Sequence, residues 1–312
     1  RVTCAINTAP GSVLYVTKHL TLRQMEYLVA LAEEGSHTSA AKRTHVSQPT
    51  LTESIRDAER ALGVSLFEKS GGVTRPTVSG EAVVDAARNA LDAALRVSNA
   101  AKWSDVLRIG AIETVAPYLL PGSLKTLRKS EPSLKIAPTS GRTDSLVAKL
   151  RDGSIDAVVL ASPVLAGYQS YALGRDEFKL LTNSSLSDKV SISHLKESSI
   201  DVILLEDGHC LRTQAINACK VATGGLAGGV IDGGSLDMVV EMVASGLGAT
   251  LVPQIAVQGL QNRKDLRVSD MTPEERAGRD LIVVWRSGHR REQEIVKVAE
   301  ALRGQFRKLA KS

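Results

Sequence analysis

At 312 residues the chain is longer than a usual single domain, so two or three compact units are expected. A hydrophobic fraction of 43% fits a normal core, and no run nears the roughly 18 uninterrupted apolar residues that a membrane span needs. The net charge of +5 is compatible with nucleic acid, whereas an aromatic fraction of 3% argues against a single-strand binder that stacks bases on rings.

Residues 1–17, "RVTCAINTAPGSVLYVT", show no sustained hydrophobic period and no signal-peptide pattern. We predict an irregular amino-terminal arm there, in which Cys4 has little claim to a function. Three cysteines in so long a chain do not make a disulfide framework, so they indicate a reducing compartment.

Three helices are predicted next. The first begins at Leu22 and ends at Gly35, and the second begins near Thr38. The third follows Ser47 as N-cap and runs to Gly63. This layout predicts a helix-turn-helix, whose third helix enters a DNA major groove. The same spacing also fits an ordinary helical hairpin with a solvated polar face.

The candidate DNA-binding residues lie at the start of the third helix and in the turn that follows it. They are Ser47, Gln48, Pro49, Thr50, Thr52, Glu53, Arg56 and Arg75. From Lys18 to Arg75 eight cationic side chains face seven acidic ones, a net charge of only +1. Binding would therefore need a dimer and clustered cations, namely Lys42, Arg43, Arg56 and Arg75.

The segment after Gly63 predicts a two-stranded turn around Gly71 and Gly72. An Ala-rich run over 80–103 then predicts a long helix. Its apolar stripe is suited to packing against a partner helix and consists of Val84, Ala87, Leu91 and Leu95.

After Trp103, short β-type runs alternate with amphipathic helical stretches, which predicts an α/β domain. The predicted strands are "VLRIGAI", "SLKIAPT", "DAVVLAS", "DVILL", "GATLVP" and "LIVVW". The predicted helices include "YLLPGSLKTLRKSE", "DSLVAKLRDG" and the final "REQEIVKVAEALRGQFRKLAKS". The six histidines show no metal-ligand spacing, and neither a metal nor a cofactor is predicted.

The stretch "LLEDGHCLRTQAINAC" places Cys210 and Cys219 nine positions apart in a predicted helix that starts at Asp207–Gly208. In one helix their Cα atoms would lie about 13.5 Å apart. A disulfide needs about 7 Å or less, so a bridge requires the helix to unwind. The first helical turn, His209 and Arg212 favour a thiolate at Cys210, and a flexible loop is expected after Cys219. The alternative is that both cysteines are inert packing residues.

The amino-terminal third resembles the DNA-binding domain of LysR-type transcriptional regulators, through "AAKRTHVSQPTLTESI" followed by "AERALGVSLFEK". The resemblance implies a winged helix-turn-helix over 18–78 and a linker or dimerisation helix over 79–103. It implies a sensor domain over 104–312 with two subdomains, like a periplasmic binding protein.

The segment "LLEDGHCLRTQAINAC", with "IGAIETVAPYLLP" and "RTDSLVAKLRDGSIDAVVLA", is similar to the peroxide-sensing OxyR group of that family. The similarity implies that Cys210 reacts with hydrogen peroxide and Cys219 resolves it. It implies a peroxide pocket lined by Thr114, Thr143, His209 and Arg212. Glu113 stands where that group frequently has proline, and Thr213 where an acid is common.

The resemblance implies a bacterial cytoplasmic, nucleoid-associated activator or repressor and no enzyme. Its expected partners are double-stranded promoter DNA, further copies in a homodimer or homotetramer, hydrogen peroxide, a thiol reductant system and RNA polymerase, with no membrane. One alternative is a LysR-type regulator of a small organic effector with incidental cysteines. Another is a thiol peroxidase or reductase, which gives the DNA-binding segment no purpose.

Overall fold

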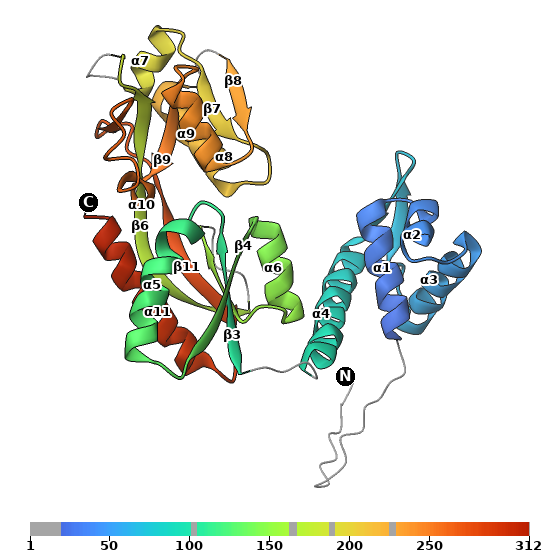
Figure 1. Cartoon of the computed structure of the whole chain (residues 1–312). Coiled ribbons are helices and arrows are strands. Elements are labelled where there is room, and N and C mark those ends of the chain that lie inside the picture. Colours follow the sequence, from blue (N-terminus) through green and yellow to red (C-terminus); the bar gives the residue numbers. More distant parts are fainter. Residues whose placement is uncertain (1–19, 101–104, 162–166, 187–190, 225–228, 312) are drawn as a thin grey trace. The chain divides into compact units, whose positions relative to one another are not determined.

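The computed structural model describes residues 20–100, 105–161, 167–186, 191–224 and 229–311. The chain divides into two compact units, residues 1–100 and 101–312 (Figure 1). The predicted arm with Cys4 and the last residues of the predicted long helix, 101–103, lie outside the described residues. Within the described part, no helix is long and apolar enough to cross a membrane.

The first unit begins with three helices, α1 (Leu22–Glu34), α2 (His37–Arg43) and α3 (Gln48–Leu62). α1 starts at a capping box on Thr21 and ends at Gly35, whose φ of 64° is left-handed. α3 starts where the Ser47 hydroxyl accepts a hydrogen bond from the Thr50 N–H. These caps confirm the predicted helix boundaries.

A short hairpin follows, formed by β1 (Phe67–Ser70) and β2 (Val73–Pro76). Gly71 and Gly72 form its turn with φ of 59° and 82°. A two-residue hairpin turn of this type requires positive φ at both positions, which glycine adopts readily. The hairpin confirms the predicted two-stranded turn and supplies the wing of the helix-turn-helix.

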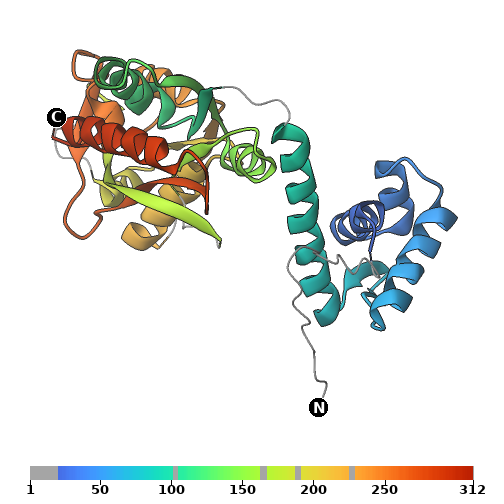
Figure 2. The ribbon, with the colours of Figure 1, turned by 90° about the horizontal axis from the view of Figure 1, so that it is seen from below.

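α4 (Val78–Ala100) is the predicted long helix, visible along its length in Figure 2. Val84 belongs to the hydrophobic core shared with α1 and α3, and Ala87 is also buried. The first half of the predicted apolar stripe is therefore buried in the core of its own unit, and packing of the stripe against a helix of a second subunit stays a prediction. Leu95 and Val97 remain exposed further along.

Glycine is required at position 80 because the start of α4 packs closely against the backbone of Leu66, which precedes β1. A Cβ added there would lie 1.9 Å from the carbonyl oxygen of Leu66. We expect Gly80→Ala to lower the free energy of unfolding by about 1–3 kcal/mol, the usual cost of overpacking. Gly304→Ala is the control, because a Cβ there meets nothing within 4 Å, and it should be neutral or stabilising. Urea unfolding measures both, and a Gly80→Ala protein as stable as the parent would contradict the packing argument.

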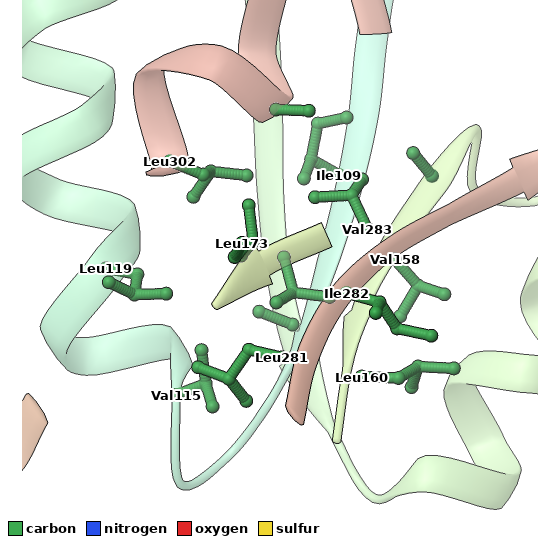
Figure 3. Packing of buried hydrophobic residues seen from close by; sticks show 14 of the residues in the cluster. Ile109, Val115, Leu119, Val158, Leu160, Leu173, Leu281, Ile282, Val283 and Leu302 are labelled. Carbon is green, nitrogen blue, oxygen red and sulfur yellow. The ribbon is translucent and has the colours of Figure 1, made fainter. Parts of the chain in front are cut away.

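The second unit contains two lobes, and the first is an α/β sandwich. Its strands follow the order β4-β3-β5-β11-β6. They are β3 (Val106–Ile112), β4 (Lys135–Gly141), β5 (Ala157–Leu160), β6 (Tyr168–Asn183) and β11 (Gly278–Arg286). α5 (Ala116–Ser130) and α11 (Glu292–Leu309) cover one face, and α6 (Thr143–Asp152) covers the other (Figure 1). Figure 3 shows Leu119 and Leu302 turned toward strand residues such as Ile109 and Leu173.

The second lobe is built on the far half of β6. That half pairs with β9 (Thr250–Pro253) and β10 (Leu266–Asp270), while β7 (Val202–Leu205) pairs in parallel with β8 (Val230–Gly233). Its helices are α7 (Ile192–Glu197), α8 (Cys210–Thr223), α9 (Leu236–Ala244) and α10 (Gln254–Val257). Each lobe has its own hydrophobic core, and β6 runs through both. The predicted α/β class is confirmed.

Two strands of this unit, β6 and β10, were not predicted, and one prediction is partly wrong. β6 was not expected, because polar residues are scattered through its first half and no compact apolar run marks it. The loop expected after Cys219 is partly wrong, since Val230–Gly233 forms β8 by pairing with β7. Residues 225–228 of that expected loop lie outside the described residues.

Candidate functional site

A small cavity opens where the two lobes meet, at the carboxyl ends of β3 and β4 and the start of α8. Its lining residues are Ile112, Glu113, Thr114, Gly141, Arg142, Thr143, Gly208, His209 and Cys210. The cavity leaves about 10 Å³ for the centre of a water-sized molecule. That is about the space of a single such molecule, so the site fits a very small polar ligand.

The fold explains why these residues meet. Glu113 and Thr114 directly follow β3, and Thr143 begins α6 with one residue between it and the end of β4. Carboxyl ends of neighbouring parallel strands lie at one sheet edge, where α/β folds bind ligands. From the second lobe, the chain after β7 turns through Gly208, and Cys210 is the first residue of α8, with His209 as its N-cap.

Thr114 is held from behind by a buried ion pair. Its hydroxyl oxygen accepts a hydrogen bond from Arg279 at 2.7 Å, and its carbonyl accepts another at 3.1 Å. The Arg279 Nε lies 3.0 Å from an Asp176 oxygen, and both side chains are 0% exposed. Because the Thr114 oxygen is engaged as an acceptor, its own O–H is available to donate into the cavity.

Two buried polar atoms at the cavity are unsatisfied. The Thr143 hydroxyl and His209 Nε2 make no hydrogen bond to any described residue. A buried polar group without a partner costs about 1–3 kcal/mol. A small ligand that both donates and accepts hydrogen bonds would therefore be stabilised here.

Charged side chains connect the lobes around the cavity. His209 Nδ1 lies 3.5 Å from a Glu113 oxygen, and Arg142 lies 3.4 Å from Glu206. The predicted pocket residue Arg212 does not line this cavity. Its guanidinium instead ion-pairs with Asp207 at 2.9 Å and with Asp232, and donates to the Leu205 carbonyl, so it ties down the loop that precedes α8.

Neither Cys210 nor Cys219 forms a disulfide here, and the two residues pack against different hydrophobic cores. Cys210 is partly buried against the first lobe, whereas Cys219 is 2% exposed within the second. α8 is helical from one to the other, which corresponds to a Cα separation of about 13.5 Å. The predicted helix is confirmed, except that it begins at Cys210 and not at Asp207–Gly208.

Burial, reinforced by the charge of Glu275, raises the pKa of Cys219 to about 11. We expect iodoacetamide at pH 8 to label Cys210 at least about 100-fold faster than Cys219, because only the thiolate is alkylated and Cys219 is shielded. Peptide mass spectrometry measures both sites. In urea, which unfolds α8, the two rates should converge. Equal labelling in the native protein would contradict this placement.

The predicted DNA-binding residues gather on α3 and the wing. Ser47, which caps α3, is exposed, as are Gln48, Pro49, Thr50, Glu53 and Arg56 on α3 and Arg75 on β2, while Thr52 is half-buried. The Arg56 side chain is 68% exposed, with its nearest carboxylate, Glu53, at 4.0 Å. Arg43, by contrast, is paired with Glu33 and Glu34 on α1. Arg56 is therefore the better placed of these two arginines to meet a phosphate.

Comparison with known proteins decides the family. Residues 22–81 match the bacterial regulatory helix-turn-helix protein model of the lysR family, and residues 100–307 match the LysR substrate binding domain. The chain belongs to the LysR family of transcription regulators. It is accordingly a DNA-binding regulator with a small-effector domain, and the family is not one of enzymes.

Three relatives of this LysR-family chain are informative. The Escherichia coli K12 DNA-binding transcriptional dual regulator OxyR is 34% identical over 305 residues, covering 94% of this chain and 99% of that protein. The transcriptional regulator EstR of Acinetobacter baylyi is 34% identical over 275 residues, covering 85% and 90%. The structure of a cysteine-to-serine mutant of Corynebacterium glutamicum OxyR with H2O2 bound matches with a TM-score of 0.59 at 30% identity, covering 94% and 95%.

Proposed function

We propose that this LysR-family regulator senses hydrogen peroxide at Cys210 and uses Cys219 to resolve the oxidised thiol. The observation that carries the proposal is the cavity. It holds Cys210 beside the Thr114 and Thr143 hydroxyls and His209, and it has room only for a very small molecule. Hydrogen peroxide, with two oxygen atoms, is one of the few reactive molecules little larger than water, and it both donates and accepts hydrogen bonds. The likeness to OxyR proteins supports the same function.

The proposed chemistry takes two steps. The Cys210 thiolate attacks one peroxide oxygen, the O–O bond breaks, and the leaving hydroxide takes a proton to become water. Sulfur is oxidised to a sulfenic acid and peroxide is reduced. The Cys219 thiol then displaces the sulfenic hydroxyl as a second water and forms the disulfide. A cellular thiol reductant reverses the bridge by thiol–disulfide exchange.

The disulfide cannot form while α8 is intact, so its formation would require the start of α8 to unwind. α8 is docked on the first lobe through the Gln214 side chain, which donates to the Ala161 carbonyl at 2.8 Å. Unwinding the start of α8 would break this contact and the Glu113–His209 pair. We propose that the two lobes then reorient, changing how a homodimer or homotetramer grips promoter DNA and engages RNA polymerase.

The second candidate is an organic effector with incidental cysteines, in line with the likeness to EstR. A wider depression of about 560 Å³ lies elsewhere on the unit, lined among others by Lys179, Gln254, Arg263 and Asp270. This volume suits an organic ligand. However, Lys179 already pairs with Asp270, and Arg263 with Glu241 and Asp265, so two of the three cations that line this site are neutralised, Lys311 being the third.

Peptide mapping separates the two candidates. With one equivalent of hydrogen peroxide, the wild-type protein should form a Cys210–Cys219 disulfide, and Cys219→Ser should retain a trapped sulfenic acid at Cys210. Cys210→Ser should form neither. If oxidation instead spreads evenly over all three cysteines, or needs a large excess of peroxide, the peroxide-sensing function is wrong.

Arg56→Ala tests the DNA face. We expect weaker promoter binding with a salt dependence shallower by about one counterion, because Arg56 is proposed to meet a phosphate. Arg60→Ala is the matched control, since Arg60 is paired with Glu53 and Asp57 on the same helix. Fluorescence anisotropy over a range of salt measures both. Equal affinity and slope for Arg56→Ala and wild type would remove Arg56 from the interface.

A further inference from the structure

We infer that Glu113 is a positioning residue that holds the His209 imidazole as the proton acceptor and donor of the peroxide reaction. The inference rests on the proposed function and adds a residue to it. Its basis is the order of groups at the cavity: a thiol at Cys210, an imidazole at His209, and the Glu113 carboxylate beside that imidazole.

The backbone of Glu113 and the ring of His209 are held by their surroundings. Glu113 lies between the end of β3 and Thr114, whose carbonyl and hydroxyl are both held by Arg279. The Glu113 carboxylate is half exposed, whereas the His209 side chain is 5% exposed at the start of α8. The imidazole is therefore buried, and the carboxylate approaches it from the solvent side.

The contact selects one form of the ring. A carboxylate 3.5 Å from Nδ1 favours a proton on Nδ1, and a neutral imidazole then carries a lone pair on Nε2. Nε2 is the buried ring atom that makes no hydrogen bond within the described residues. It is accordingly left as the atom that can accept a proton, and the carboxylate stabilises the imidazolium that results. A carboxylate that orients a catalytic histidine works in the same way in other proteins.

The other charged groups at this point have different partners. Arg142, from the start of α6, is paired with Glu206, and Arg212, from α8, is paired with Asp207 and Asp232. Arg279, behind Thr114, is paired with Asp176. Glu113 is thus the carboxylate that the fold places against the imidazole.

The proton then follows a closed path. Nε2 makes no hydrogen bond to the Cys210 thiol in the described structure, so the thiol proton passes to Nε2 by way of the bound hydrogen peroxide, and the thiolate attacks one oxygen of that molecule. The S–O bond forms as the O–O bond breaks, and the imidazolium returns one proton to the leaving oxygen. The products are a sulfenic acid, one water and a neutral His209, with Glu113 unchanged.

The test compares two reactions of Cys210 in the full chain, with Cys219→Ser as background so that the sulfenic acid persists. One is oxidation by hydrogen peroxide, followed with a sulfenic-acid trap and peptide mass spectrometry. The other is alkylation by iodoacetamide, whose iodide leaving group needs no proton. The variants are Glu113→Gln, Glu113→Asp and, as a control, Asp144→Asn, which removes an exposed carboxylate next to Thr143.

At pH 7 we expect Glu113→Gln to slow peroxide oxidation about tenfold, part of the roughly 10²- to 10⁴-fold that a positioned proton-transfer group contributes. Alkylation should slow less, because it needs no proton delivery. Glu113→Asp should recover most of the peroxide rate, and Asp144→Asn should match the parent.

Equal slowing of both reactions by Glu113→Gln would indicate altered access to the thiol and overturn the inference, as would unchanged rates in that variant. A parent protein whose Cys210 reacts with peroxide no faster than an ordinary exposed thiol would instead overturn the proposed function. The Glu113 variants are compared with the parent only if Cys210 of the parent reacts rapidly with peroxide. Failure of the Glu113 inference can therefore be told apart from failure of the proposed function.

Discussion

Arg279→Met is expected to lower the free energy of unfolding of the second unit by about 3–5 kcal/mol, because it leaves the Asp176 carboxylate buried without its counterion. The side chains of Asp176 on β6 and Arg279 on β11 are each 0% exposed, and the Arg279 Nε lies 3.0 Å from an Asp176 oxygen. The same change removes both hydrogen bonds that hold Thr114. Urea unfolding followed by the fluorescence of Trp285, which is buried on β11, measures the loss.

The deficit of Arg279→Met should depend on pH. Burial raises the pKa of Asp176 even in the presence of Arg279, and removing the arginine raises it further. When the pKa of a carboxyl is higher in the folded than in the unfolded protein, the carboxyl adds to the free energy of unfolding at low pH. That contribution is lost as pH rises through the folded pKa. The deficit should therefore be largest near neutrality and shrink as pH falls toward about 4.

A double variant supplies the control. Asp176→Leu combined with Arg279→Met removes both charges, so its loss of stability should be smaller than the sum of the two single losses. Additive losses would show that the two side chains do not stabilise the fold as a pair.

The second large effect is expected in α8. On oxidation of the wild-type protein, backbone amides of residues 211–219 should lose protection from hydrogen exchange by about 100-fold or more, because the disulfide requires that this helix unwind. Mass-spectrometric hydrogen exchange on reduced and oxidised protein measures the loss.

Cys219→Ser is the matched control for α8, since its Cys210 can be oxidised but cannot form the bridge. Its helix should stay protected after peroxide treatment. An oxidised wild-type protein that contains the disulfide and keeps α8 fully protected would contradict the unwinding argument.

The elements predicted correctly are those specified by local chemistry. α3 was predicted because Ser47 caps it and Gly63 ends it. α1, α5 and α6 were predicted because their apolar residues recur at helical spacing, and Gly35 ends α1. β6 was not predicted, since its first half shows no regular alternation of buried and exposed residues and it changes partners from β11 to β9 and β10 halfway along. Nothing local specifies that change.

The site shows the same division between local and distant signals. Cys210 and His209 are neighbours in sequence, so their chemistry was visible in one short motif. The support behind Thr114 was missed, because Asp176 and Arg279 are far from it in sequence and the strand that carries Asp176 was not expected. The Glu113–His209 contact likewise depends on the meeting of two lobes. The buried Asp176–Arg279 salt bridge and the Glu113–His209 contact leave no periodic pattern in the sequence.

DNase footprinting on a target promoter tests peroxide sensing at Cys210 most directly. The footprint of the reduced wild-type protein should change its boundaries after one equivalent of hydrogen peroxide and return after treatment with a dithiol. The footprint of Cys210→Ser should be the same before and after peroxide. A peroxide-dependent change that persists in Cys210→Ser would contradict sensing at this thiol.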